Sequence, residues 1–90
     1  MFYCVYILLS EKDNQFYIGY TTDIKRRIKE HFQGQVSSTR HRLPMRLIHY
    51  EAFISLEDAK SREMFLKSGA GHEQLQAKLK HTLNKYLSLS

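Results

Sequence analysis

The sequence predicts an α+β domain in which helices flank a small three-stranded sheet, mixed or antiparallel, with the element order β-β-α-β-α-α. Two observations carry this prediction. The N-terminal run is short and apolar on both alternating faces, which is typical of a strand covered on both sides. Later segments repeat their apolar residues every three or four positions, which is typical of amphipathic helices. The 90 residues fit a single domain, residues 1–90.

The first half of the chain is expected to form a hairpin and a helix. Strands over residues 2–9 and 16–20 are separated by a polar turn and should pair antiparallel. Gly19 in the second strand permits close approach of another chain or a ligand. A helix over residues 24–32 follows, ended by Gly34. Its apolar stripe is expected to consist of Ile24, Ile28 and Phe32.

The second half is expected to add a strand and two helices. A polar, basic loop over residues 35–44 leads to a strand over residues 45–53. Ser55 opens a capping-box-like start, and the helix after it should run to about Lys67. The last helix is expected over residues 72–87. Its inward positions would be Leu75, Leu79, Leu83 and Tyr86.

Composition narrows the class of protein. Fourteen Lys and Arg against nine Asp and Glu give a net charge of +5, which on a small body favours a polyanionic partner. A merely solubilising surface is the alternative. The single cysteine, Cys4, excludes an intramolecular disulfide and suits a reducing cytoplasm, and with five scattered histidines it gives no zinc-ligand spacing. The N-terminus has no signal-peptide features, and no apolar run is long enough to span a membrane, so we expect a cytoplasmic protein without membrane contact.

Glu63 is the most informative single residue. On a helical wheel it lies on the side meant for the core, together with three apolar residues: Leu56, Ala59 and Leu66. Burying an unpaired carboxylate is costly, so Glu63 is expected either to pair with a neighbouring Arg or Lys or to bind a cation. A helix whose face is partly open would also explain its position.

Arg27 and His31 form a second unusual pair. With Asp23 they repeat every four residues beside the apolar stripe of the first helix, at the edge of the core. Arginine suits a phosphate because its planar guanidinium makes charge-assisted hydrogen bonds. A simple helix pair between Asp23 and Arg27 is the alternative.

Tyr6 and Tyr17 lie on the two paired strands, where tyrosine usually serves packing. Near an arginine and a bound cation, however, a phenol loses its proton more easily and can act as a general base. Phosphodiester hydrolysis needs a base, a cation on the phosphate and a metal that stabilises charge. A single carboxylate such as Glu63 is enough to hold Mg²⁺.

These motifs resemble those of the GIY-YIG nuclease superfamily. The first motif stands as Cys4-Val5-Tyr6, with Cys4-Val5 in place of Gly-Ile, and the second stands intact as Tyr17-Ile18-Gly19. The segments TTDIKRRIKEH and AKSREMFLK match the helices that carry the family's arginine and glutamate. The resemblance covers nearly the whole chain and looks closest to the small stand-alone bacterial members, the UPF0213-like group.

The resemblance implies a GIY-YIG-type fold and a metal-dependent DNA endonuclease that uses Mg²⁺ or Mn²⁺. It implies that Tyr6 or Tyr17 is the general base, with Tyr6 favoured, that Arg27 contacts the scissile phosphate, and that His31 relays a proton or binds phosphate. Glu63 would hold the metal. Substrate specificity would be structural or weak, or it would be supplied by a homodimer or a partner protein.

A nucleic acid would also need residues that hold its backbone, since phosphate contacts position a strand without reading bases. The candidates are Arg26, Ser38, Thr39, Arg40, Arg42 and Lys67. Lys67 follows Glu63 by one helical turn and is equally well placed to be its ion-pair partner. Two other functions remain open: a nucleic-acid-binding module that uses the same basic face without cleavage, and a small protein-interaction domain that uses exposed Phe and Tyr.

Overall fold

A computed structural model describes residues 1–87 and contains one three-stranded antiparallel sheet. Its strands are β1 (Tyr3–Ser10), β2 (Phe16–Thr21) and β3 (Met45–Phe53), in the order β2-β1-β3. β1 and β2 form the expected hairpin, in which Tyr6 lies opposite Gly19. The α+β prediction is therefore confirmed, and of the two sheet types considered the antiparallel one is present.

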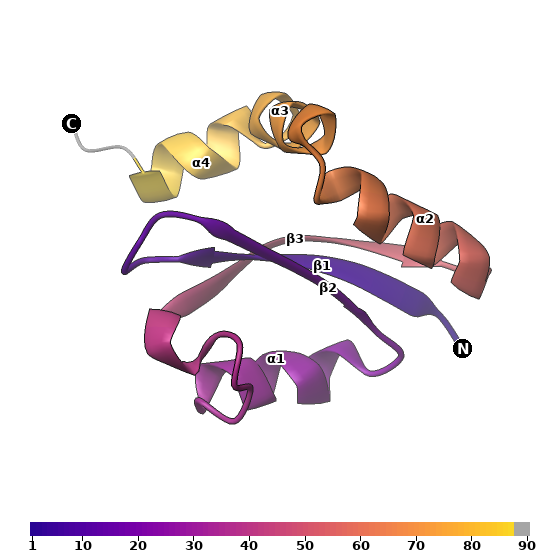
Figure 1. Cartoon of the computed structure of the whole chain (residues 1–90), viewed down its shortest axis with the longest axis horizontal. Helices are drawn as coiled ribbons and strands as arrows, with labels where there is room; N and C mark the ends of the chain where they lie inside the picture. Colours follow the sequence, from indigo (N-terminus) through magenta and orange to yellow (C-terminus); the bar gives the residue numbers. More distant parts are fainter. Residues whose placement is uncertain (88–90) are drawn as a thin grey trace.

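Helices cover both faces of the sheet (Figure 1). α1 (Ile24–Phe32) lies against one face, and α2 (Leu56–Leu66), α3 (Gly69–Lys78) and α4 (Lys80–Leu87) lie along the other. A short 3-10 turn, η1 (Arg40–Arg42), interrupts the loop between α1 and β3. Among residues 1–87, no helix is both long enough and apolar enough to cross a membrane.

The central strand β1 builds two separate cores because its side chains alternate between the two faces. Residues 4–10 are all buried, as the doubly apolar sequence of this strand predicts. Val5, Ile7 and Leu9 face α2 and α3, where they pack with buried residues of these helices. Tyr6 and Leu8 face α1 and pack there with Ile28 and Met45. Tyr6 is thus a core residue of the α1 face.

Two expectations for the helices were wrong in detail. The last helix is divided, because the backbone of Leu79 leaves helical geometry and α4 begins at Lys80. Ile28 is buried on α1, but Phe32 at the end of that helix is 48% exposed. The fully buried residue of the last turn is instead His31. The helix is therefore rotated about its axis so that a polar residue, and not Phe32, faces the sheet there.

The junction between α2 and α3 is tightly built. Ser68 caps α3 by accepting a hydrogen bond from the backbone N–H of Gly71. A Cβ placed on Gly71 would lie 2.0 Å from the carbonyl oxygen of Phe65 and 2.5 Å from Cα of Leu66. Glycine at position 71 therefore allows α3 to cross the end of α2 at backbone contact.

Candidate active site

The side chain of Tyr6 crosses its partner strand above Gly19. A Cβ at Gly19 would lie 2.6 Å from the Tyr6 hydroxyl oxygen, and 3.2 Å from a ring carbon of Tyr17. Glycine at this position therefore makes room for both phenol rings, whose centroids are 6.3 Å apart. The close approach expected at Gly19 is made by side chains of the same chain.

A chain of hydrogen bonds runs inward from this tyrosine. The hydroxyl oxygen of Tyr6 lies 2.8 Å from Nε2 of His31, and Nδ1 of His31 lies 2.8 Å from Oγ1 of Thr39. His31 and Thr39 are both fully buried, and Tyr6 is 1% exposed. Both ring nitrogens of His31 are thus satisfied away from water, which fixes the orientation of the imidazole.

Tyr17 and Arg27 complete the cluster on the same face of the sheet. The Tyr17 ring lies 5.0 Å from the imidazole of His31, centroid to centroid. Arg27 is partly exposed, and its Nη1 donates to a carboxylate oxygen of Glu30 at 3.0 Å. The pair between Asp23 and Arg27, which was the alternative interpretation of these residues, is absent from the described residues, because Asp23 instead caps α1 by accepting from the backbone N–H of Arg26.

Burial and charge set the protonation of this cluster. Burial raises the pKa of Tyr6 to about 12, although the nearby Arg27 acts in the opposite direction. Burial and then the positive charge of Arg27 lower the pKa of His31 to about 4. At neutral pH the tyrosine and the histidine are therefore both uncharged. Hydrogen bonding to Tyr6 and to Glu30 raises the pKa of Arg27, which remains a cation.

The low pKa of His31 predicts a loss of stability in mild acid. An unfolded histidine binds a proton as the pH falls through about 6.5, whereas the folded protein resists protonation down to about 4. The unfolded state thus gains protons first, and the free energy of unfolding should fall by about 3 kcal/mol across this window. Urea unfolding at a series of pH values would measure it. His31→Gln should flatten this part of the pH profile, and parallel profiles would contradict the assignment.

Glu63 stands apart from the tyrosine cluster. Its helix α2 covers the face opposite α1, and both helices approach the edge strand β2: α2 contacts it directly, and His31 of α1 reaches Tyr17 (Figure 1). The Glu63 side chain is 17% exposed and pairs with Lys67 at 3.3 Å. An ion pair with a neighbouring lysine was one of the explanations offered for the core-facing position of Glu63, and the pair with Lys67 confirms it. The grouping of Glu63 with Tyr6, Tyr17 and Arg27 has no direct contact to support it within residues 1–87.

A single carboxylate, that of Glu63, limits the type of metal ion that could bind at this position. Residues 1–87 hold no group of three or more His, Cys, Asp and Glu arranged around a metal position. An all-protein cage is therefore not built there. A hard cation such as Mg²⁺ needs fewer protein ligands, because it keeps several waters and takes substrate phosphate oxygens. Glu63 can supply that one carboxylate, and its partner Lys67 is exposed enough to move aside.

The six expected backbone-contact residues divide into two groups. Arg26, Ser38, Arg40 and Lys67 have exposed side chains and remain available to a ligand. Thr39 and Arg42 are instead engaged in contacts within the protein. Thr39 is buried against His31, and Arg42 binds Asp13 at 2.8 Å and the backbone oxygen of Gln15 at 3.1 Å. A nucleic acid could reach Thr39 only if the loop between α1 and β3 moved. The contacts of Arg42 hold this loop against the β1–β2 turn.

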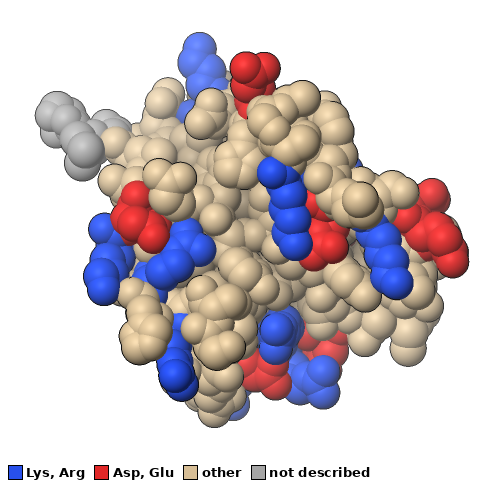
Figure 2. Space-filling model, in the orientation of Figure 1, with Lys and Arg blue, Asp and Glu red and all other residues tan. Residues whose placement is uncertain are grey.

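Charges on the surface are mixed. Figure 2 shows that on the face viewed there, most basic side chains lie beside an acidic one. Ion pairs such as Arg26–Glu30 and Arg46–Glu11 account for part of this mixture. The excess of positive charge is therefore spread in small groups on this face, and a polyanion would be held at several separate points.

Comparison with known proteins identifies the class to which this fold and this arrangement of side chains correspond. The sequence model of the GIY-YIG catalytic domain matches residues 2–76. The chain therefore belongs to the GIY-YIG family, as its motifs predict.

Within this family the chain is similar to UPF0213 proteins. One from Streptococcus pneumoniae serotype 4 is 46% identical over 61 residues, which make up 67% of this chain and 62% of that protein. Another from Haloquadratum walsbyi is 43% identical over 65 residues, 70% of this chain and 73% of that protein. The solution structure of a UPF0213 protein from Bacillus halodurans matches with a TM-score of 0.55 and 45% identity, covering 86% of this chain and 84% of that one.

Proposed function

We propose that this protein is a metal-dependent endonuclease that hydrolyses phosphodiester bonds of nucleic acid, with DNA as the substrate. The observation that carries the proposal is the buried chain from Thr39 through His31 to Tyr6, which ends beside the cation Arg27. Membership in the GIY-YIG family supports it. A hydrogen-bonded base next to a cation is the arrangement that hydrolysis of a phosphodiester requires.

In this proposal Arg27 binds the scissile phosphate and neutralises charge that develops on its oxygens. Arg27 is partly exposed, and it is held by a carboxylate on its own helix, so it can turn to a ligand without disrupting the core. The phosphate in turn offsets the positive charge of Arg27, which is one cause of the low pKa of His31. Substrate binding therefore favours a proton on His31.

Tyr6 then acts as the base. Its hydroxyl oxygen accepts a proton from the attacking water, while its own proton passes to Nε2 of His31 over the 2.8 Å hydrogen bond. Nε2 can accept only if Nδ1 carries the ring proton, and Nδ1 donates to Oγ1 of Thr39 in that tautomer. Thr39 is thus a positioning residue. Tyr17, which is more exposed than Tyr6, orients the water or the substrate.

Glu63 would hold the divalent cation, which when bound supplies charge stabilisation at the phosphate. β2 is an edge strand with α1 over one face, while α2 contacts it from the other. A nucleic acid that crosses this edge can therefore meet residues of both helices. Exposed Arg26, Ser38, Arg40 and Lys67 would hold its backbone.

Nicking of supercoiled plasmid with Mg²⁺ or Mn²⁺ tests the proposal, and a Thr39 series tests the carrying observation. Thr39→Val keeps the shape but removes the hydroxyl, so the ring tautomer is no longer fixed. We expect nicking to fall by about 10- to 100-fold, which is less than the about 100- to 10,000-fold of a full acid–base contribution, because Thr39 acts only through His31. Thr39→Ser should restore most of it. A Thr39→Val protein that remains folded and nicks at the wild-type rate would exclude the relay.

A binding module without cleavage is the second candidate function. The observation in its favour is the ion pair of Glu63 with Lys67, which occupies the carboxylate that a metal would need. This function predicts salt-dependent binding of DNA without nicking in either metal. The same plasmid assay, combined with a binding titration at two salt concentrations, separates the two functions.

A further inference from the structure

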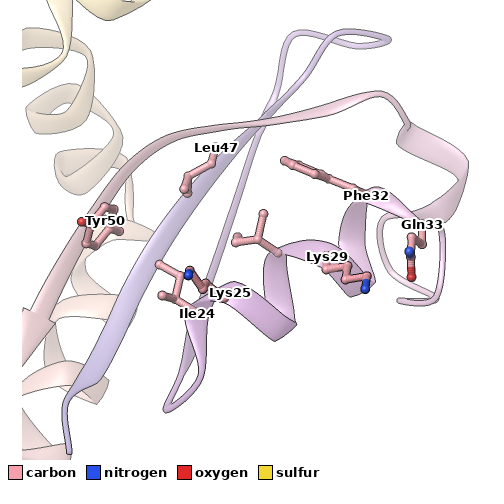
Figure 3. A pocket seen from close by; sticks show the side chains of 8 residues that line it. Ile24, Lys25, Lys29, Phe32, Gln33, Leu47 and Tyr50 are labelled. Carbon is pink, nitrogen blue, oxygen red and sulfur yellow. The ribbon is translucent and has the colours of Figure 1, made fainter.

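An open groove runs between α1 and β3, and neither Arg27 nor His31 is among the residues that line it. Figure 3 shows α1 forming one wall, with Leu47 and Tyr50 of β3 on the other. The groove has a volume of about 570 Å³. Its apolar lining consists of Ile24, Ile28, Phe32, Leu47 and Tyr50, and its polar lining of Lys25, Lys29 and Gln33.

Two aromatic rings in this groove are more exposed than a core position would leave them. Tyr50 is 56% exposed and Phe32 is 48% exposed. Tyr50 lies opposite Tyr6 in the β1–β3 register, and therefore on the α1 face of the sheet. The departure of Phe32 from the expected core stripe places it at the wall of this groove. The groove thus offers flat apolar surface to a ligand.

The charge at the groove is positive only. No carboxylate lines it, and within residues 1–87 neither Lys25 nor Lys29 forms an ion pair. On the opposite side of the same helix, Arg26 and Arg27 both pair with Glu30. The two lysines beside the groove are therefore cations without an internal counterion, which suits an anionic ligand.

We propose that this groove binds an unpaired nucleobase of a nucleic-acid strand, with Lys25 and Lys29 on its adjoining phosphates. A base has the flat π-face that stacks on tyrosine or phenylalanine, and its phosphate supplies the negative charge that the lysines lack. The inference rests on the proposed function and refines its substrate: the strand to be cut has an unpaired nucleotide close to the scissile bond. A paired base inside a duplex could not enter.

The position of the groove agrees with such a substrate. Arg27 and His31 belong to the same helix as the groove-lining residues without lining the groove themselves, and a helix with its side chains is about 10–12 Å across. A strand crossing α1 would therefore engage Arg27 on one side and the groove on the other within a few nucleotides. A locally unpaired strand has the flexibility that this path needs.

Binding measured in EDTA, where no cleavage occurs, tests the inference. A labelled short single strand and a blunt duplex of the same sequence are titrated by fluorescence anisotropy with wild type, Tyr50→Ala and Tyr50→Phe. Tyr50→Ala should weaken single-strand binding by about 5- to 100-fold, the range of base–aromatic stacking, and leave the duplex nearly unchanged. Tyr50→Phe should retain binding. Met64→Ala, which removes a 73% exposed apolar side chain on α2, is the matched control.

The possible results separate this inference from the proposed function. The inference is overturned if Tyr50→Ala leaves single-strand affinity intact, or lowers it no more than Met64→Ala does. This holds even if the protein nicks plasmid. A selective loss with Tyr50→Ala supports it even in a protein that never nicks. A dimer detected by sedimentation and abolished by Tyr50→Ala would assign the groove to a second copy of the chain, and would also overturn it.

Discussion

Glu63→Gln is expected to abolish metal-dependent nicking, with a loss of about a thousandfold or more. The substitution removes the negative charge that would hold a divalent cation and keeps the shape of the side chain. A bound metal contributes several kcal/mol to stabilising the transition state, and each 1.4 kcal/mol corresponds to a factor of ten in rate. Nicking rates over a range of Mg²⁺ and Mn²⁺ concentrations measure the effect.

The fold should survive this change. Glu63 gives up one ion pair with the exposed Lys67, and such i,i+4 pairs are worth only about 0.3–0.5 kcal/mol. Glu57→Gln is the matched control, because it removes an exposed carboxylate from the first turn of the same helix. It should nick at nearly the wild-type rate. Equal nicking by wild type and Glu63→Gln would show that Glu63 holds no catalytic metal, or that a contaminating nuclease is responsible.

Gly71→Ala is expected to lower the free energy of unfolding by about 3 kcal/mol or more, which is the larger effect of the two glycine substitutions proposed for α3. The added methyl group would lie 2.0 Å from the backbone oxygen of Phe65, and backbone cannot move aside as a flexible side chain does. Overpacking of a well-filled site costs typically about 1–3 kcal/mol and sometimes more. Chemical or thermal unfolding followed by circular dichroism measures the change.

Gly69→Ala provides a matched control two residues away. Gly69 lies in the same helix, but a Cβ there meets no atom within 4 Å. Since alanine favours a helix over glycine by about 0.8–1 kcal/mol, this variant should be as stable as the wild type or slightly more so. If both variants were equally destabilised, the cause would lie in the flexibility of the α2–α3 junction and not in the contact of Gly71 with Phe65.

Much of the fold could be predicted because its signals are local. The apolar run of β1, the polar turn after it and the caps Asp23 and Ser55 each depend on neighbouring residues only. The break at Leu79 could not be predicted, because the leucine positions continue the helical period through it. Phe32 was wrongly predicted to face the core for a related reason. Periodicity shows which residues share one side of a helix, but tertiary packing decides how the helix is rotated about its axis against the sheet.

The candidate site was predictable only in part. The wheel of α2 correctly indicated that Glu63 shares a side with buried Ala59 and Leu66, but an ion pair with Lys67 resolves the apparent cost of that position. The role of Thr39 had no signal. It lies in a polar loop where a threonine is normally exposed, and only the tertiary fold brings its hydroxyl to His31, eight residues away in the sequence.

The alternation of side chains along β1 links the proposed activity to correct folding. A slip of one residue in the register of a strand sends every side chain to the opposite face. In β1 that slip would replace Tyr6 by Val5 or Ile7 at the candidate site, and would bury a phenol among the aliphatic residues of the other core. The Tyr6 ring also fits only where the opposite residue is Gly19. A misregistered molecule would thus lose its core packing and the proposed base together, so partly misfolded chains would be unstable and would also lack the proposed nuclease activity.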